Sequence, residues 1–128
     1  MKGQVSVEFL VYFTLVLLIG TFFFLNYSNS IERISEIKAE NDAEKLLEEI
    51  VFEINSAVVS GNGYERRFYL EDTIDGFSNY TITVWNYSVF LDWDGRSKSS
   101  RIITCSINGS INKKWNLIRN VNGVVYVD

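Results

Sequence analysis

The chain has 128 residues and a formal net charge of -4, and hydrophobic residues make up 47% of it, which is enough apolar material for one folded domain and excludes a disordered chain. No run of Lys or Arg is present to follow a phosphate backbone, so no nucleic acid partner is expected. Without histidine, and with one cysteine, the chain lacks the common ligands of zinc and haem and the usual general bases, so we expect neither an enzyme nor a bound cofactor or metal.

The first predicted element is an apolar helix over residues 5–25. Sixteen of these 21 residues are apolar or aromatic, and the exceptions are Ser6, Glu8, Thr14, Gly20 and Thr21. At about 1.5 Å per residue, a helix of this length extends about 31 Å, the hydrocarbon thickness of a bilayer. The segment is therefore predicted to span a membrane, and Lys2 before it favours a cytoplasmic N-terminus. It is too long for the apolar region of an ordinary secretory signal peptide.

An amphipathic helical stalk is predicted to follow, over residues 26–60. Its apolar residues recur at spacings of three and four, which places them on one helix face. They are Ile31, Ile34, Ile37, Leu46, Leu47, Ile50, Val51, Ile54 and Val58. The other face carries eight carboxylates against three cations, and we interpret it as a solvated surface. Because no proline intervenes before Gly61 and Gly63, one nearly continuous helix is predicted over residues 4–60, with residues 39–42 the least costly place for a bend.

From residue 61 to residue 128 the sequence is typical of a small β-rich head, because β-branched and aromatic residues alternate with polar ones. Strands are predicted at residues 64–70, 80–85, 87–93, 101–107, 115–120 and 124–127, and residues 97–100 are predicted to form a polar loop. Tight turns are predicted at Asp75-Gly76, Asp94-Gly95, Asn108-Gly109 and Asn122-Gly123. The predicted fold class is therefore α+β, with a long N-terminal helix and an antiparallel sheet wrapped on its second half. Cys105 falls in a predicted strand, and we expect a buried apolar side chain rather than a disulfide between chains.

The start of the chain contains a specific combination of residues. Glu8 places a carboxylate in an apolar helix, where an acid costs about 2.5 to 3.5 kcal/mol at mid-membrane and less near the edge, from which it can reach water. Its context is Lys2-Gly3 and then Gln4-Val5-Ser6-Val7-Glu8-Phe9, followed by an apolar stretch. This segment resembles the class III signal peptide of archaeal type IV pilin-like proteins, whose core pattern is Gln-x-Ser-x-Glu-Phe.

The resemblance implies that residues 1–3 are a leader, which a membrane-embedded prepilin peptidase removes by cutting between Gly3 and Gln4. It also implies that the apolar helix is kept, and that pilus assembly machinery moves the subunits from the membrane into a filament. There they would pack helix against helix, with Glu8 and Phe9 at the assembly interface. Glu8 would neutralise the new α-amino group of Gln4, or be satisfied differently, for example through Ser6 or Thr14.

Two functions follow from these observations. The first is a structural subunit of a surface filament that serves adhesion. Its precursor would lie in the cell membrane and the assembled filament outside the cell, and the filament would be similar to a pilus rather than an archaellum. The alternative is a single-pass membrane-anchored surface protein whose β-rich head binds a ligand or partner and never polymerises. Tryptophan and tyrosine residues of the head, including Trp85, Trp93 and Trp115, offer a sugar-binding or adhesive face, although such residues are more often expected in the core.

Two further motifs occur in the chain. Four Asn-x-Ser/Thr sequons make Asn26, Asn79, Asn86 and Asn108 candidate glycosylation sites. Asn79 and Asn108 fall in predicted turns and are favoured, whereas Asn26 lies nearest the membrane and is the least favoured. Residues 92–95, Asp-Trp-Asp-Gly, are similar to the start of a calcium-binding loop, but no carboxylate follows at the right distance, so no metal site is expected.

Overall fold

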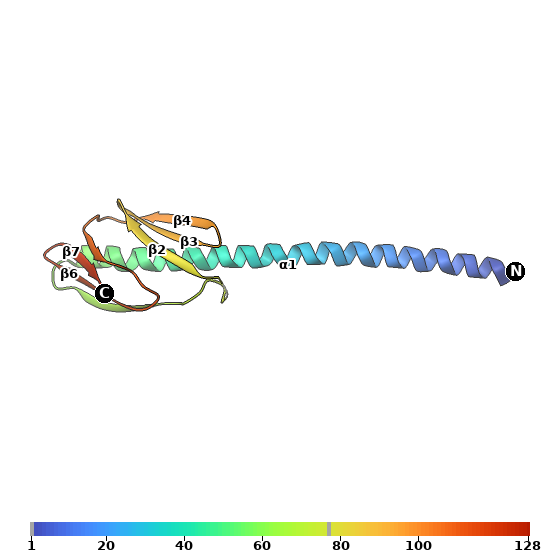
Figure 1. Ribbon diagram of the computed structural model, residues 1–128, viewed down its shortest axis with the longest axis horizontal. Helices are drawn as coiled ribbons and strands as arrows, with labels where there is room; N and C mark the ends of the chain where they lie inside the picture. The colour runs from blue at the N-terminus through green and yellow to red at the C-terminus, as the bar shows by residue number, and fades with distance from the viewer. Residues whose placement is uncertain (1, 77) are drawn as a thin grey trace. The chain divides into compact units, whose positions relative to one another are not determined.

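A computed structural model describes residues 2–76 and 78–128. One helix, α1 (Lys2–Ser60), is followed along the chain by strands, so the predicted α+β class with a long N-terminal helix and a small sheet head is confirmed (Figure 1). The strands are β1 (Glu65–Leu70), β2 (Tyr80–Trp85), β3 (Ser88–Trp93), β4 (Arg96–Arg101), β5 (Ile107–Gly109), β6 (Lys114–Val121) and β7 (Val124–Val127). Met1, which belongs to the predicted leader, lies outside the described residues, as does the side chain of Lys2.

The chain divides into two compact units. The N-terminal unit ends at Ile37, and its described part is the first portion of α1. The C-terminal unit, Lys38–Asp128, contains the last portion of α1 and all the strands. The long helix therefore contributes to two units with different surroundings, and each unit is described separately below.

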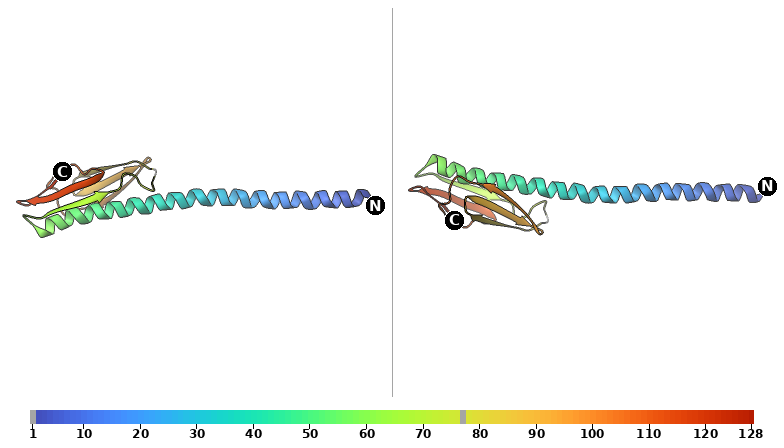
Figure 2. Two further views of the ribbon diagram at one scale, coloured as in Figure 1. Left: turned by 90° about the horizontal axis from the view of Figure 1, so that it is seen from below. Right: turned by 90° about the horizontal axis from the view of Figure 1, so that it is seen from above.

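The strands of the C-terminal unit form two sheets. The four-stranded sheet has the order β1-β6-β7-β5, and the three-stranded sheet has the order β2-β3-β4. All pairs are antiparallel except β5 with β7, which is parallel. Within this unit α1 runs along one side of the strands, as both views of Figure 2 show. Each sheet therefore has a face toward the helix and a face away from it.

One hydrophobic core joins the helix to both sheets. The helix contributes buried residues at spacings of three and four, which form a single stripe: Ala43, Leu46, Leu47, Ile50, Ile54 and Ala57. Strand residues that alternate along the sequence meet this stripe, as the period of two in a β-strand requires. Examples are Phe68, Leu70, Leu91, Ile118 and Val125. Two asparagines buried in the core, Asn116 and Asn120, have hydrogen-bond partners for their side-chain amides. Asn120 Nδ2, for example, donates to the Ala57 carbonyl over 2.9 Å.

The ends of the elements follow the local turn chemistry. The helix ends at Ser60, and Gly61 takes a φ of 78°, a left-handed conformation that glycine adopts without steric cost. Asp94-Gly95 joins β3 to β4, and Asn122-Gly123 joins β6 to β7; all four residues have positive φ. These predicted hairpin turns are confirmed.

Four predictions about strands and turns are wrong. Residues 97–100 lie in β4 rather than in a loop, and residues 102–106 are a connection rather than a strand. Asn108-Gly109 belongs to β5 rather than to a turn. Tyr87 is the second residue of the β2–β3 turn, with a φ of 62°, rather than the first residue of a strand. Cys105 lies in the 102–106 connection and is exposed, so the expectation of a buried thiol is also wrong.

The helix face predicted to pack on the head is shorter than expected. Ile31, Ile34 and Ile37 belong to the N-terminal unit and are exposed, whereas burial begins at Ala43. The acidic face is mostly exposed, as predicted, and the head supplies a cation to it, because Lys98 Nζ of β4 lies 3.1 Å from an oxygen of Glu44 and 3.6 Å from one of Glu40. The sheets thus cover only the last portion of α1 and neutralise part of its charge.

Glu53 is the charged residue of α1 that the core buries, and it is 3% exposed. Its Oε1 lies 3.5 Å from the Arg66 guanidinium, and its Oε2 has no hydrogen-bond partner among the described residues. Burial raises the pKa of Glu53, Arg66 opposes the shift, and the charge of Glu49 adds to it. An ionised carboxylate in this position therefore destabilises the folded C-terminal unit.

Replacing Glu53 by Gln is expected to raise the free energy of unfolding near pH 7 by about 1 kcal/mol. Because the pKa is raised in the folded state, ionised Glu53 lowers stability above that pKa, and the penalty disappears as the pH falls through it toward the ordinary value of 4.5. Urea unfolding of the full chain in detergent, followed by tryptophan fluorescence at about pH 7 and about pH 4, measures both effects. Glu48→Gln is the control, because Glu48 is exposed and is not among the groups that shift the pKa of Glu53. A less stable Glu53→Gln variant would mean that the pair with Arg66 outweighs the burial.

Candidate assembly surface and other sites

The apolar surface of the N-terminal unit is the largest exposed feature of the described chain. Its sixteen large apolar side chains between Val5 and Leu25 are all exposed, from 49% at Ile19 to 70% at Tyr12. The helix is long and apolar enough to cross a membrane, and none of its most apolar stretch is buried within the chain. Since soluble monomers rarely expose apolar patches above a few hundred Å², this surface needs lipid or other protein to cover it.

Polar side chains within this surface are satisfied by the helix itself. The hydroxyls of Thr14 and Thr21 each donate to the carbonyl four residues earlier, over 2.8 Å in both cases. Bonds of this kind let a hydroxyl enter an apolar environment without an unpaired donor. The two threonines are therefore compatible with either lipid or a packed helical core.

Glu8 differs from these threonines. No hydrogen bond or ion pair reaches its carboxylate within residues 2–76 and 78–128. The hydroxyl of Thr14 is engaged with Leu10, and no bond joins Glu8 to Ser6, so neither suggested partner satisfies Glu8 in the single chain. Among the described side chains, Glu8 is therefore a carboxylate without a partner in the single chain.

The predicted cleavage residues lie at the start of α1. Gly3 and Gln4 are helical and exposed, and no atom lies within 4 Å of the position that a Cβ on Gly3 would occupy. The fold therefore does not require glycine at this position. Phe9 is also exposed, and its ring stacks on that of Phe13 with centroids 6.1 Å apart.

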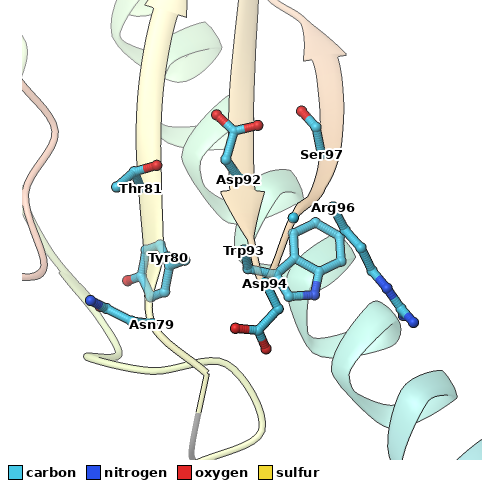
Figure 3. A pocket seen from close by; sticks show the side chains of 9 residues that line it. Asn79, Tyr80, Thr81, Asp92, Trp93, Asp94, Arg96 and Ser97 are labelled. Atoms are coloured by element: carbon cyan, nitrogen blue, oxygen red, sulfur yellow. The ribbon is translucent and has the colours of Figure 1, made fainter.

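A shallow depression of about 380 Å³ lies at one end of the three-stranded sheet (Figure 3). Thr81, Asp92 and Ser97 form one row across its strands by register. The Tyr80 hydroxyl donates to the Glu71 carbonyl, and burial raises the pKa of Tyr80 to about 12, so the phenol stays neutral at physiological pH. Among the described residues, no group of three or more histidine, cysteine, aspartate or glutamate side chains is placed to hold a metal ion, here or elsewhere.

The four sequon asparagines are all exposed but differ in their surroundings. Asn86 is the first central residue of the β2–β3 turn, with a φ of 47°. The Asn79 side chain accepts a hydrogen bond from Lys113, and Asn108 lies within β5. Asn26 donates its side-chain amide to the Phe22 carbonyl over 2.8 Å. The turn therefore presents Asn86 with fewer constraints than the other three.

We expect glycan occupancy of native protein to be highest at Asn86. Its side chain projects from a two-residue turn, whereas the amides of Asn79 and Asn26 are already engaged and Asn108 is held in a strand. Mass spectrometry of glycopeptides from native material measures the occupancy of each sequon, and Asn86→Gln should remove the major modified species. Higher occupancy at Asn108 than at Asn86 would contradict this ranking.

The aromatic residues of the head separate into core and surface groups. Trp93 and Tyr80 are buried, but the expectation that most such residues lie in the core is wrong for four others. Trp85 and Trp115 are 70% and 68% exposed, and Tyr69 and Tyr87 are about half exposed. Sequence reasoning considered these residues together, but the alternation along β1 and β6 was a usable signal, because it separates Tyr69 and Trp115 from the inward-facing residues beside them.

These observations define a long apolar helix surface without cover in the chain and a small head with exposed aromatic residues. The apolar helix is compatible with membrane anchoring. Comparison with known proteins finds no family model, no curated protein and no solved structure that matches this chain.

Proposed function

We propose that this protein is a structural subunit of a surface filament similar to an archaeal type IV pilus, which polymerises through its N-terminal apolar helix and serves adhesion. The observation that carries the proposal is the uncovered apolar surface between Val5 and Leu25, which overlaps the Gln4 to Phe9 motif and extends beyond it. Outside lipid, burial of each larger side chain against neighbouring copies contributes about 1.5 to 3 kcal/mol. Packing of helices against each other is then strongly favoured over exposure to water.

The motif supports this function over simple anchoring. A membrane anchor needs no carboxylate one turn inside the apolar segment, and Glu8 has no partner within the described chain. A positive α-amino group created at Gln4 supplies such a partner in a packed helical core of low dielectric. In this proposal the leader residues 1–3 are removed by a prepilin peptidase, and membrane insertion precedes assembly.

The experiment that tests the function combines imaging with N-terminal sequencing of native surface material. Filaments that contain this chain, starting at Gln4, support the proposal. A protein that starts at Gln4 but is found only as single particles in detergent supports the non-polymerising surface protein instead. A mature chain that begins beyond Leu25 overturns both functions, since either one needs the apolar helix.

Replacing Glu8 by Ala and by Gln, separately, is expected to reduce filament yield by at least about tenfold, the effect of losing about 1.4 kcal/mol per subunit. Gln keeps the size of the side chain and one acceptor oxygen but not the charge, so a defect in both variants indicates that the negative charge matters. Filament yield is measured by imaging, and cleavage by intact mass. If both variants are cleaved normally and form filaments at normal yield, Glu8 has no role in assembly.

A further inference from the structure

The face of the four-stranded sheet that points away from α1 contains an ordered group of side chains. Trp115 lies opposite Tyr69 in the pairing of β6 with β1, and Leu117 lies opposite Arg67. Leu117 also exchanges two backbone hydrogen bonds with Asp128, of 2.8 and 3.0 Å. Arg67, Leu117 and Asp128 therefore form a row beside the aromatic pair. Their neighbours along β1 and β6, including Phe68, Asn116 and Ile118, are buried on the opposite face.

Trp115 provides a flat apolar surface in this group. It is 68% exposed, and the edge of one ring contacts the other in its pair with Tyr69, with centroids 5.3 Å apart and ring planes at 65°. Contact with Tyr69 restrains the tryptophan ring, so little rotamer freedom is lost when a ligand binds to it. A large exposed aromatic side chain that its neighbour holds in place is typical of a binding surface.

Arg67 provides an uncommitted cation next to that ring. Its side chain is exposed, and no carboxylate of the described residues lies within ion-pair distance of it. Asp128, by contrast, accepts a hydrogen bond from Arg119, so the charges of that pair are balanced. Glu65 lies two residues before Arg67 on the same face of β1, opposite Arg119, so this face carries two arginines against two carboxylates. Arg67 is the cation of this face that lies beside the aromatic pair without an ion-pair partner among the described residues.

A shallow depression of about 310 Å³ connects these groups, and Arg67, Trp115, Leu117 and Asp128 are among the residues that line it. One side offers guanidinium donors, the other a carboxylate acceptor, and an indole forms a wall. A pyranose ring has C–H groups that pack on an aromatic face, and its hydroxyls both donate and accept hydrogen bonds. An acidic sugar adds a carboxylate, which arginine binds through two parallel hydrogen bonds.

We infer that this face binds an acidic polysaccharide through a carboxylate-bearing sugar unit. The sugar ring stacks on Trp115, its carboxylate accepts hydrogen bonds from Arg67, and a hydroxyl donates to Asp128. A nucleic acid is a poorer match, because its affinity depends on many cations along one surface, whereas this face carries two arginines against two carboxylates. The inference goes beyond filament formation and applies equally if the chain never polymerises.

The test uses the full chain in a detergent without a sugar head group. Oligomers of galacturonic acid are titrated in, with oligomers of galactose as the neutral probe, and binding is measured by calorimetry. We expect the acidic probe to bind at least about tenfold more tightly than the neutral one, the effect of one charge-assisted pair. Arg67→Gln should remove this preference, and Trp115→Ala should weaken binding of both probes at least about tenfold, with Trp115→Phe retaining part of it.

Trp85→Ala is the matched control, since Trp85 is 70% exposed but belongs to the other sheet. It should leave binding of both probes unchanged. The inference is overturned if neither probe binds, if both bind equally, or if Trp115→Ala and Trp85→Ala behave alike. It is also overturned if Trp115→Ala changes the sedimentation of the chain without any effect on sugar binding, because the face would then contact a second copy. Filament imaging is a separate readout, so a failure of polymerisation is distinguishable from a failure of this site.

Discussion

Gly3→Leu is expected to abolish filament formation while leaving the C-terminal unit folded. The resemblance to class III signal peptides implies a peptidase that cuts between Gly3 and Gln4, and we expect a leucine in place of the cleavage glycine to block the cut. The uncut chain keeps Lys2, whose ammonium group would have to enter a core of packed apolar helices. An unpaired charge in such a core costs free energy and opposes assembly. Cleavage would instead lower the formal net charge of the chain from -4 to -5, because Lys2 is the only charged residue among residues 1–3.

The structure makes this substitution informative because nothing in the fold opposes it. Beyond its own helical turn, a Cβ at Gly3 meets no atom within 4 Å, so a side chain at this position points into open space in the single chain. Gly20→Ala is the control, since a Cβ there also meets open space and alanine favours a helix more than glycine does. Intact mass shows cleavage, and imaging shows assembly. Filaments built from uncut Gly3→Leu chains would refute the proposed processing.

The local elements of the fold were predictable from sequence where one signal dominated. The helix was predicted over residues 4–60 and spans Lys2–Ser60, because no proline interrupts it and Gly61 ends it in a left-handed conformation. Strands β2 and β7 were predicted at their observed bounds, since alternation and flanking turns agree there.

Strand β4 was missed because its residues have weak strand propensity. Its sequence, Arg-Ser-Lys-Ser-Ser-Arg, is typical of a loop, and it becomes a strand through pairing with β3 and through the contacts of Lys98 with Glu40 and Glu44. These contacts join residues more than fifty positions apart, which no local pattern contains. Its position at the edge of a sheet also suits a charged sequence, because charge discourages pairing with other chains.

The turn predicted at Asn108-Gly109 is wrong, and the structure gives a different reason for the glycine. Asn108-Gly109 was interpreted as a turn, but Gly109 lies in β5, with a φ of 103°. A Cβ on this residue would lie 1.9 Å from the carbonyl oxygen of Val127, so glycine is needed for a close approach of two backbones. The dipeptide alone cannot distinguish a turn from such an approach, since both need a residue without a side chain.

The candidate sites show the same division between local and distant information. The Gln4 to Phe9 motif and the four sequons could be found in the sequence, but the pairing of Trp115 with Tyr69, and the lack of a partner for Arg67, depend on the register of β1 with β6. The exposure of Ile31, Ile34 and Ile37 was also not predictable, because periodicity marks an apolar face without showing how far a sheet extends along it.

Alanine substitutions at two isoleucines of α1 are expected to affect different properties. Ile50→Ala should lower the stability of the C-terminal unit, whereas Ile19→Ala should impair assembly. Ile50→Ala should lower the free energy of unfolding of the C-terminal unit by about 2 to 5 kcal/mol, because Ile50 is fully buried among helix and strand residues. Ile19→Ala should leave that free energy unchanged, since Ile19 is 49% exposed and belongs to the N-terminal unit. Urea unfolding of both full-length variants in detergent measures this difference.

Assembly should respond to Ile19→Ala instead. If neighbouring helices bury Ile19, the lost burial of about 1.5 to 3 kcal/mol raises the subunit concentration needed for filaments by about 10- to 100-fold. A bilayer alone would tolerate the change, because an alanine leaves the segment apolar enough to span it. Normal filament yield from Ile19→Ala, together with a normally folded head, would therefore mean that lipid, and not a second copy of the chain, covers this part of the helix.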